Sequence, residues 1–190
     1  MATRPSSTES LVEQFRAEAA LRDKAQIKTL TELARTTRDR LVPVLEGLEH
    51  ALPSNEGATP AAATSADVES WRKAAAAAVE GFADPPSGET ATNVARSSLA
   101  SAVRQLATAV DTYAAAQKLT GSTREAVVDL AVRQRADAIF TWSVGATGLD
   151  AVNVDAGYGH QHVFLPTSDG SGALTPDPEP EGVHDNHDHP

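Results

Sequence analysis

Apolar residues recur at three- and four-residue steps along most of residues 10–148, the spacing that places them on one face of an α-helix. The longest such run covers residues 10–52, and shorter runs follow at 65–83, 92–119 and 122–148. Breaker sequences rich in Pro, Gly and Ser separate the runs, and β-branched or aromatic stretches of strand length are nearly absent. The pattern therefore predicts an all-α protein, an antiparallel helical bundle of about four helices with a long first helix.

Three of the expected helix starts carry a capping signal. Ser10 and Ser122 are each followed three residues later by glutamate, which is the capping-box pattern. Thr64 or Ser65 precedes the second apolar run, and either hydroxyl can accept a hydrogen bond from a free backbone N–H of the first turn. We expect the first, second and fourth helices to begin near these residues.

Interruptions of the pattern indicate where the helices bend or end. Pro43 lies inside the first run and removes one backbone hydrogen bond, so a kink or break is expected near Arg40. Apolar residues are sparse at residues 20–26, and this part could project as a coiled coil or be loosely packed. The fourth helix is expected to end near Gly145 or Gly148.

The character of the sequence changes after the fourth apolar run. Residues 149–155 roughly alternate apolar and polar positions, which is typical of an extended segment. Val163, Phe164 and Leu165 form an apolar cluster, but the sequence after Pro166 has too little apolar area to offset the entropy of ordering it. The expected order is a disordered N-terminus at 1–9, the helical bundle at 10–148, an extended docking segment at 149–165 and a disordered acidic tail at 166–190.

Charge divides the chain at the same point. Residues 1–148 contain 18 acidic residues and all 16 Lys and Arg, a charge of −2, whereas residues 149–190 contain 8 acidic residues and no Lys or Arg, a charge of −8. An acidic tail does not favour nucleic-acid binding, which needs clustered positive charge. The basic cluster on the first helix is interleaved with acidic residues and is interpreted as a solvated helix face. It comprises Lys24, Lys28, Arg35, Arg38 and Arg40.

Composition removes several classes of function. The chain has no cysteine, which excludes disulfides, thiolate catalysis and cysteine-based zinc sites. No apolar stretch has the length of a signal peptide or a membrane span, so a cytoplasmic protein without a membrane partner is expected. The sequence lacks a nucleophile elbow, a phosphate-binding loop and the Glu-x-x-His pairs of di-metal bundles. We therefore expect a non-enzymatic protein that uses no cofactor.

Arg135 is the one charged residue on the apolar stripe of the expected fourth helix. It could pair with Asp111 or Asp137, or extend its methylene groups towards solvent. A ligand pocket is the alternative interpretation, because a charged residue on a buried face can mark one.

Histidines give the sequence its only candidate metal ligands. Imidazole and carboxylate groups together suit Zn, Ni or Cu ions. Such groups occur around His160 and His162, and again in the last residues of the tail. A flexible tail offers no second shell of partners to orient its ligands, so only weak binding of divalent ions is expected there. The candidate metal residues are His160, His162, His184, His187 and His189.

Residues 40–52, Arg-Leu-Val-Pro-Val-Leu-Glu-Gly-Leu-Glu-His-Ala-Leu, close the first helix. This segment resembles the Leu-Pro-Val-Leu-Asp-x-Leu-Glu-x-Ala-Leu segment that follows the long helix of GrpE-type nucleotide exchange factors of DnaK-type chaperones. The resemblance implies a co-chaperone with a small helical bundle and a β domain. The later helices are long and Ala-rich, and the tail is short and acidic, so the rest of the chain departs from that family.

The leading hypothesis is a helical adaptor or structural protein that binds a protein partner. The first helix would pair within the chain, or with a second copy as a homodimer, and the apolar cluster after residue 162 would serve as a linear motif. The expected partner-binding residues are Leu30, Leu33, Leu41, Val44, Leu48, Val163, Phe164 and Leu165. A GrpE-like co-chaperone, metal binding by the tail and a small-molecule-binding bundle remain as alternatives.

Overall fold

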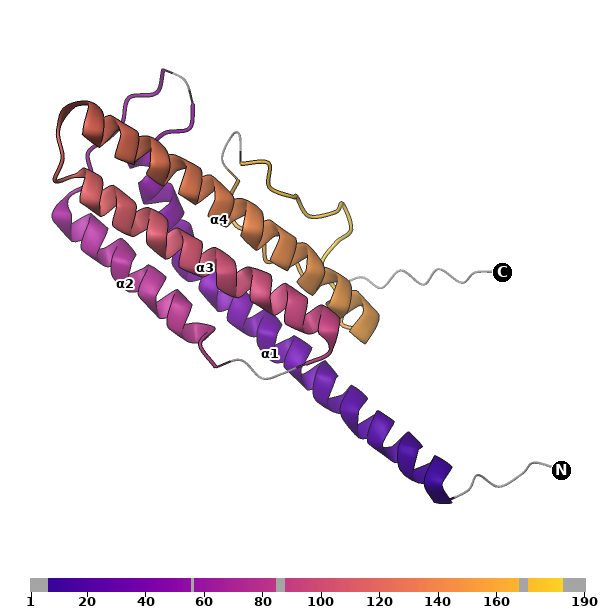
Figure 1. Ribbon diagram of the computed structural model, residues 1–190. Coiled ribbons are helices and arrows are strands. Elements are labelled where there is room, and N and C mark those ends of the chain that lie inside the picture. The colour runs from indigo at the N-terminus through magenta and orange to yellow at the C-terminus, as the bar shows by residue number, and fades with distance from the viewer. Residues whose placement is uncertain (1–6, 56, 85–87, 168–170, 183–190) are drawn as a thin grey trace.

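Four α-helices make up the fold of the protein in a computed structural model (Figure 1), which describes residues 7–55, 57–84, 88–167 and 171–182. The described residues contain no strand, which confirms the all-α prediction. The helices are α1 (Ser7–Ala51), α2 (Ser65–Gly81), α3 (Thr90–Ala116) and α4 (Gly121–Ala156). No helix in this part of the chain is long and apolar enough to cross a membrane.

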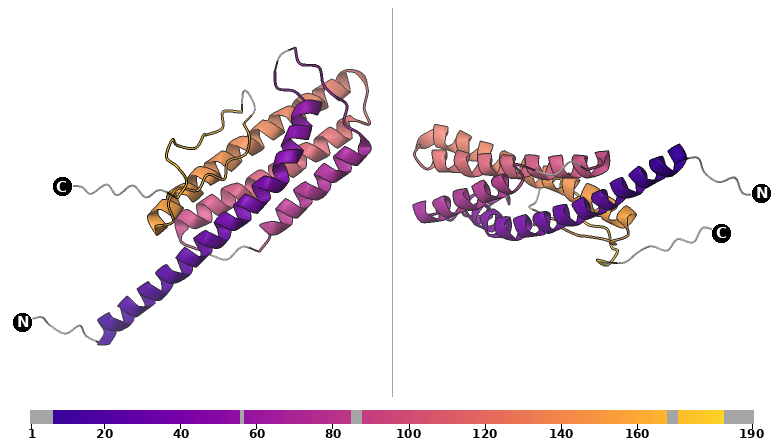
Figure 2. Two further views of the ribbon diagram at one scale, coloured as in Figure 1. Left: turned by 180° about the vertical axis from the view of Figure 1, so that it is seen from behind. Right: turned by 90° about the horizontal axis from the view of Figure 1, so that it is seen from below.

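The bundle is built on the hairpin of α3 and α4, which lie side by side along most of their length (Figure 1). α2 packs beside α3, and the C-terminal half of α1 lies across the same side of the hairpin (Figure 2). The core between them contains Trp142 together with Leu41, Leu48, Leu99 and Leu106, all fully buried. Alanines at many of the contact positions allow these helices to approach closely.

The expected apolar stripe of the first helix is buried inside the chain itself. Leu30, Leu41, Val44 and Leu48 belong to the core, and Leu33 packs against it. Leu30, Leu41, Val44 and Leu48 are therefore covered within the chain, whereas Leu33 is only partly buried. α1 is continuous through Pro43 rather than broken there, although its axis is not straight (Figure 2).

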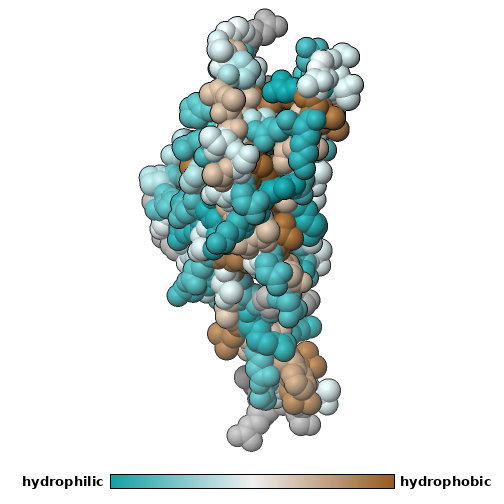
Figure 3. All heavy atoms as spheres, turned by 90° about the vertical axis from the view of Figure 1, so that its left-hand side faces the viewer, coloured by the Kyte–Doolittle hydropathy of each residue, from teal (hydrophilic) through white to brown (hydrophobic). Residues whose placement is uncertain are grey.

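The N-terminal part of α1 projects beyond the other three helices (Figures 1 and 2). Its apolar residues lie on the surface: Leu11 is 51% exposed, Phe15 60% and Leu21 70%. Figure 3 shows hydrophobic side chains gathered at this end of the molecule. The expectation that this half of the helix projects is met, and the helix begins before Ser10, inside the N-terminus that was expected to be disordered.

α4 continues past both glycines at which it was expected to end. Gly145 faces Leu99 of α3 and Gly148 faces Ala95, so these glycines permit close helix packing rather than helix termination. The helix ends at Gly157, whose φ of +83° closes a left-handed cap in which Tyr158 N–H donates to Asn153 O at 2.9 Å. Residues 149–155, which the alternation assigned to an extended segment, are therefore helical.

The capping predictions have mixed outcomes. Thr64 caps α2 in a capping box with Asp67, as expected. Ser122 lies inside α4, because Gly121 adopts a φ of +62° and the helix begins there after Thr120. Ser10 likewise lies inside α1. A Ser-x-x-Glu pattern can therefore also occur inside a helix. Which residue becomes the N-cap depends on the backbone conformation immediately before the helix.

Candidate metal centre

Two histidines and two aspartates converge beside the C-terminal end of α4. Asp150 belongs to α4, His160 and His162 follow the helix end, and Asp177 lies further along the chain. One ligand atom from each residue lies within 4.8 Å of every other. Only His160 and His162 of this group were singled out from the sequence, because the alternation around Asp150 suggested an extended segment and the tail around Asp177 was expected to be disordered.

Three of the distances between these side chains are close to the ligand–ligand distances of a tetrahedral metal shell. His160 Nδ1 lies 3.0 Å from Asp150 Oδ2 and 3.3 Å from Asp177 Oδ2, and His162 Nε2 lies 3.3 Å from Asp177 Oδ1. Zinc–nitrogen and zinc–oxygen bonds of about 2.0–2.2 Å in a tetrahedron give ligand–ligand distances of roughly 3.3 Å. A single ion can therefore contact all four groups after small side-chain movements.

One atom of the cluster is buried without a hydrogen bond. His162 Nε2 is inaccessible to solvent and has no hydrogen-bond partner among the residues that the structure describes. It lies within ion-pair distance of Asp177 Oδ1, but the two groups are not aligned as donor and acceptor. A buried polar atom that lacks a partner costs stability, and an ion placed between imidazole and carboxylate would satisfy both.

Backbone geometry holds the histidines in place. Gly157 and Gly159 have φ values of +83° and +70°, which let the chain turn sharply after α4. A Cβ at Gly159 would lie 2.6 Å from the carbonyl carbon of Gly182, so only glycine fits at the point where the backbone near residue 159 meets the backbone near residue 182. Gly182 N–H in turn donates to His160 O at 3.0 Å.

Further hydrogen bonds hold the side chain of Asp150 and the backbone of His162. Asp150 Oδ1 accepts from the backbone N–H of Gln161, which leaves Oδ2 directed at His160. The N–H of His162 donates to Glu181 Oε1 at 3.0 Å, and its carbonyl accepts from Arg38 Nη1 at 3.1 Å. Asp150 and the His162 backbone thus have hydrogen-bond partners that a flexible tail would lack.

The basic cluster of α1 faces this segment. Arg38 binds the carbonyl of His162, and Arg35 donates to Gln161 Oε1 and lies 3.6 Å from Glu181. The interpretation of the whole cluster as a solvated face is therefore wrong for these two arginines. They lie against the acidic C-terminal part of the chain, where opposite charge favours the contact.

The apolar cluster after His162 docks on the bundle. Trp142 Nε1 donates to Val163 O at 2.7 Å, Val163 and Leu165 are buried, and Phe164 packs against the core. In this structure the segment docks within the chain, where Val163 and Leu165 are covered. His184, His187 and His189 lie outside the described residues.

Part of the predicted acidic tail is also ordered. Leu174 N–H donates to Ser143 Oγ at 2.9 Å, and Ala173 packs against the core. Residues 171–182 thus contact the bundle. Hydrogen bonds and ion pairs, rather than apolar burial, supply most of these contacts, and apolar content alone could not reveal them.

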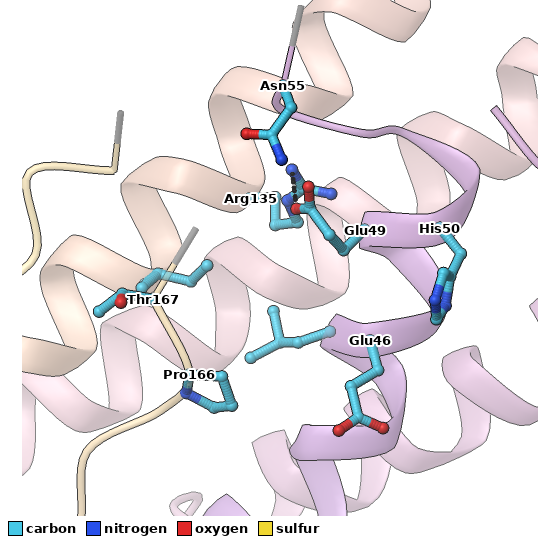
Figure 4. A pocket seen from close by; sticks show the side chains of 9 residues that line it. Glu46, Glu49, His50, Asn55, Arg135, Pro166 and Thr167 are labelled. Atoms are coloured by element: carbon cyan, nitrogen blue, oxygen red, sulfur yellow. Dashed lines mark ion pairs between the residues drawn. The ribbon is translucent and has the colours of Figure 1, made fainter. Parts of the chain in front are cut away.

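A second feature is a cavity of about 340 Å³ between the end of α1, α4 and residues 166–167 (Figure 4). Arg135 is only 1% exposed and bonds Glu49 Oε2 at 2.7 Å, Ser54 Oγ at 2.6 Å and Leu52 O at 2.8 Å. Burial lowers the pKa of Arg135, and the Glu49 carboxylate opposes that shift. Arg135 is not paired with Asp111 or Asp137, the two partners expected from the sequence. Asp111 pairs with Arg72 at 2.7 Å. Because Glu49 already neutralises the guanidinium, Arg135 offers no free charge to a ligand in this cavity.

The segment that resembles GrpE-type factors, residues 40–52, forms the C-terminal end of α1 and packs into the core. No protein-family model matches the chain, and no curated protein or solved structure matches it either.

Proposed function

We propose that the protein is a non-enzymatic metal-binding protein that holds one divalent transition-metal ion between Asp150, His160, His162 and Asp177. The observation that carries the proposal is the convergence of four donor atoms, one from each residue, within 4.8 Å of one another. Two imidazoles and two carboxylates form a set suited to zinc and related ions. Magnesium and calcium are disfavoured because they prefer shells of six or more oxygen atoms.

Four protein ligands support a structural rather than a catalytic role for the ion. A catalytic zinc keeps one position open for water or substrate, whereas a structural zinc is enclosed by four protein ligands. The burial of Asp150 and His160 also limits the access of solvent to the ion. The proposal thus agrees with the absence of a catalytic signature in the sequence.

Isothermal titration calorimetry of the full chain with zinc chloride tests the proposal. We expect one site with a Kd below about 10 μM, equivalent to more than about 7 kcal/mol of binding free energy. His162→Ala should weaken binding at least tenfold, about 1.4 kcal/mol, because it removes one of the four ligands. His50→Ala is the matched control, since His50 is an exposed histidine on α1 that lies outside the cluster.

Replacement of His184, His187 and His189 together by alanine separates the two candidate metal regions. Zinc affinity should be unchanged if the cluster holds the ion. Loss of binding in this triple variant, with His162→Ala left unaffected, would assign the ion to the end of the chain and refute the proposed site.

The projecting half of α1 favours a second function, association with another copy of this chain. Leu11 and Phe15 expose apolar area that nothing in the described structure covers. Residues 10–18 carry two acidic residues and one arginine, a charge of −1, while residues 19–28 carry three basic residues and one aspartate, a charge of +2. Antiparallel pairing of two copies would place these opposite charges together.

Light scattering over a range of protein concentrations tests this association. We expect a dimer whose population rises with concentration and is abolished by Phe15→Glu, because that variant places a charge in the paired face. Leu174→Glu is the control, since Leu174 is a similarly exposed apolar residue far from α1 in sequence. A monomer at every concentration would remove self-association as a function of this helix.

A further inference from the structure

The four proposed ligands belong to three different parts of the chain. Asp150 is fixed on α4, His160 and His162 lie in the proximal segment, residues 158–167, and Asp177 lies in the distal segment, residues 171–182. One ion therefore joins the helix to both segments. We propose that the ion acts as a clasp, whose binding closes the distal segment onto the bundle and whose release lets that segment open. This inference rests on the metal-binding function proposed above.

The proximal segment does not depend on the ion for its position. Val163 and Leu165 are buried, and Trp142 binds the carbonyl of Val163. Burial of two such side chains and one buried hydrogen bond hold the chain against the bundle whether or not an ion is present. His160 and His162 are therefore presented to the ion by a segment that is already docked.

The distal segment lacks an anchor of this kind. Its largest apolar side chain, Leu174, is 43% exposed, and only the small side chain of Ala173 packs against the core. Its remaining contacts are polar, and its ion pair of Glu181 with Arg35 joins two partly exposed side chains at 3.6 Å. Exposed ion pairs contribute little to stability, so the contact of Asp177 with the cluster is the contact that an ion would strengthen most.

Thermodynamic linkage sets the size of the effect. An ion can shift the equilibrium between the open and closed segment only by the ratio of its affinities for the two forms. The open form retains Asp150, His160 and His162 but loses Asp177. The factor by which Asp177→Asn weakens zinc binding should therefore match the factor by which zinc suppresses opening, and we expect both to be at least tenfold.

Hydrogen exchange of the full chain, measured with EDTA and with saturating zinc chloride, tests the clasp. The amides of Leu174 and Gly182 are the reporters, because each donates a hydrogen bond that exists only while the distal segment is closed. Zinc should slow their exchange at least tenfold. The Asp177→Asn variant should still bind zinc through the other three ligands, without slowing the two reporters.

Glu179→Gln is the matched control, since it removes an acidic side chain from the same segment that does not belong to the cluster, and it should behave as the unaltered protein. If calorimetry shows zinc binding but Leu174 and Gly182 exchange equally with and without zinc, the clasp is refuted and the metal site stands. An unchanged zinc affinity in Asp177→Asn would also refute the clasp. If zinc does not bind at all, the proposed function fails first and the clasp fails with it.

Discussion

Arg135 carries a positive charge to a position that is almost inaccessible to solvent, and its environment is arranged around that charge. Glu49 supplies the counter-ion, and Leu52 O and Ser54 Oγ each accept a hydrogen bond, while Nε has no hydrogen-bond partner among the described residues. A buried ion pair contributes little net stability, yet the loss of one partner leaves the other charge uncompensated. The two partners differ in exposure, because the Glu49 side chain reaches solvent and the Arg135 side chain does not.

Glu49→Ala should lower the free energy of unfolding by about 2 kcal/mol. This is less than the roughly 3–5 kcal/mol lost when a fully buried pair is broken, because the Glu49 side chain is 37% exposed. Urea denaturation measures the change. Glu46→Ala removes an exposed carboxylate from the wall of the same cavity and should alter stability by less than about 0.5 kcal/mol. Equal effects of the two variants would show that Arg135 does not need Glu49.

The N-terminal cap of α2 stabilises the ionised form of the Asp67 carboxyl group. Two hydrogen bonds, from the Thr64 hydroxyl at 2.7 Å and from the Thr64 backbone N–H at 2.8 Å, hold the pKa of Asp67 below its ordinary value of 3.8. Because the pKa is lower in the folded state, the stabilisation is present above pH 3.8 and is lost as the pH falls through the lowered pKa. Asp67 therefore reports on the integrity of this cap.

Thr64→Val should raise the pKa of Asp67 towards 3.8, because the variant removes the hydroxyl that causes most of the shift. The backbone N–H remains and should keep part of the effect. Titration of the carboxyl carbon by NMR gives the pKa directly. Ser65→Ala should leave it unchanged, and a shift in that variant as large as in Thr64→Val would mean that Thr64 is not the capping residue.

At the scale of elements, α3 and α4 approach closely because α4 carries glycine where α3 presents side chains or backbone. A Cβ at Gly145 would lie 2.8 Å from Leu99 Cγ and 2.9 Å from the backbone nitrogen of Leu99. A Cβ at Gly148 would lie 3.4 Å from the Cβ of Ala95, which is an ordinary contact. A side chain would therefore clash with α3 at position 145 but would fit at position 148.

Alanine substitutions at these two positions should change stability in opposite directions. Gly148→Ala should gain up to about 1 kcal/mol, because alanine is the better helix former and its side chain fits. Gly145→Ala should lose up to about 2 kcal/mol, because overpacking can cost up to about 3 kcal/mol and the gain in helix propensity offsets about 1 kcal/mol of it. Thermal unfolding of both variants provides the comparison, and stabilisation by Gly145→Ala would show that α3 and α4 do not pack this closely.

The helices themselves could be predicted from the sequence because apolar spacing is a local property. The end of α4 could not, since Gly145 and Gly148 carry the same local signal whether they terminate a helix or face another one. Ser122 shows the same limit, because its capping-box pattern is intact and the cap is still Thr120. In each case the deciding contact or backbone turn lies outside the pattern.

At the scale of the whole molecule, the acidic C-terminal part of the chain lies against arginines of α1. The chain after residue 148 carries a charge of −8, and Gln161, His162 and Glu181 in it lie against Arg35 and Arg38 of α1. His160 and His162 could be nominated from the sequence because two histidines so close together are a local signal. Asp150 and Asp177 could not, because 27 residues separate them and only the continuation of α4 and the return of the distal segment bring them together.

Zinc X-ray absorption of the full chain loaded with one equivalent of zinc tests the central claim most directly, because it counts and identifies the atoms bound to the ion. The account predicts four nitrogen and oxygen ligands at about 2.0–2.2 Å, of which two are imidazole nitrogens. A six-coordinate shell dominated by water oxygen, or a shell with three or more imidazoles, would contradict a site built from Asp150, His160, His162 and Asp177.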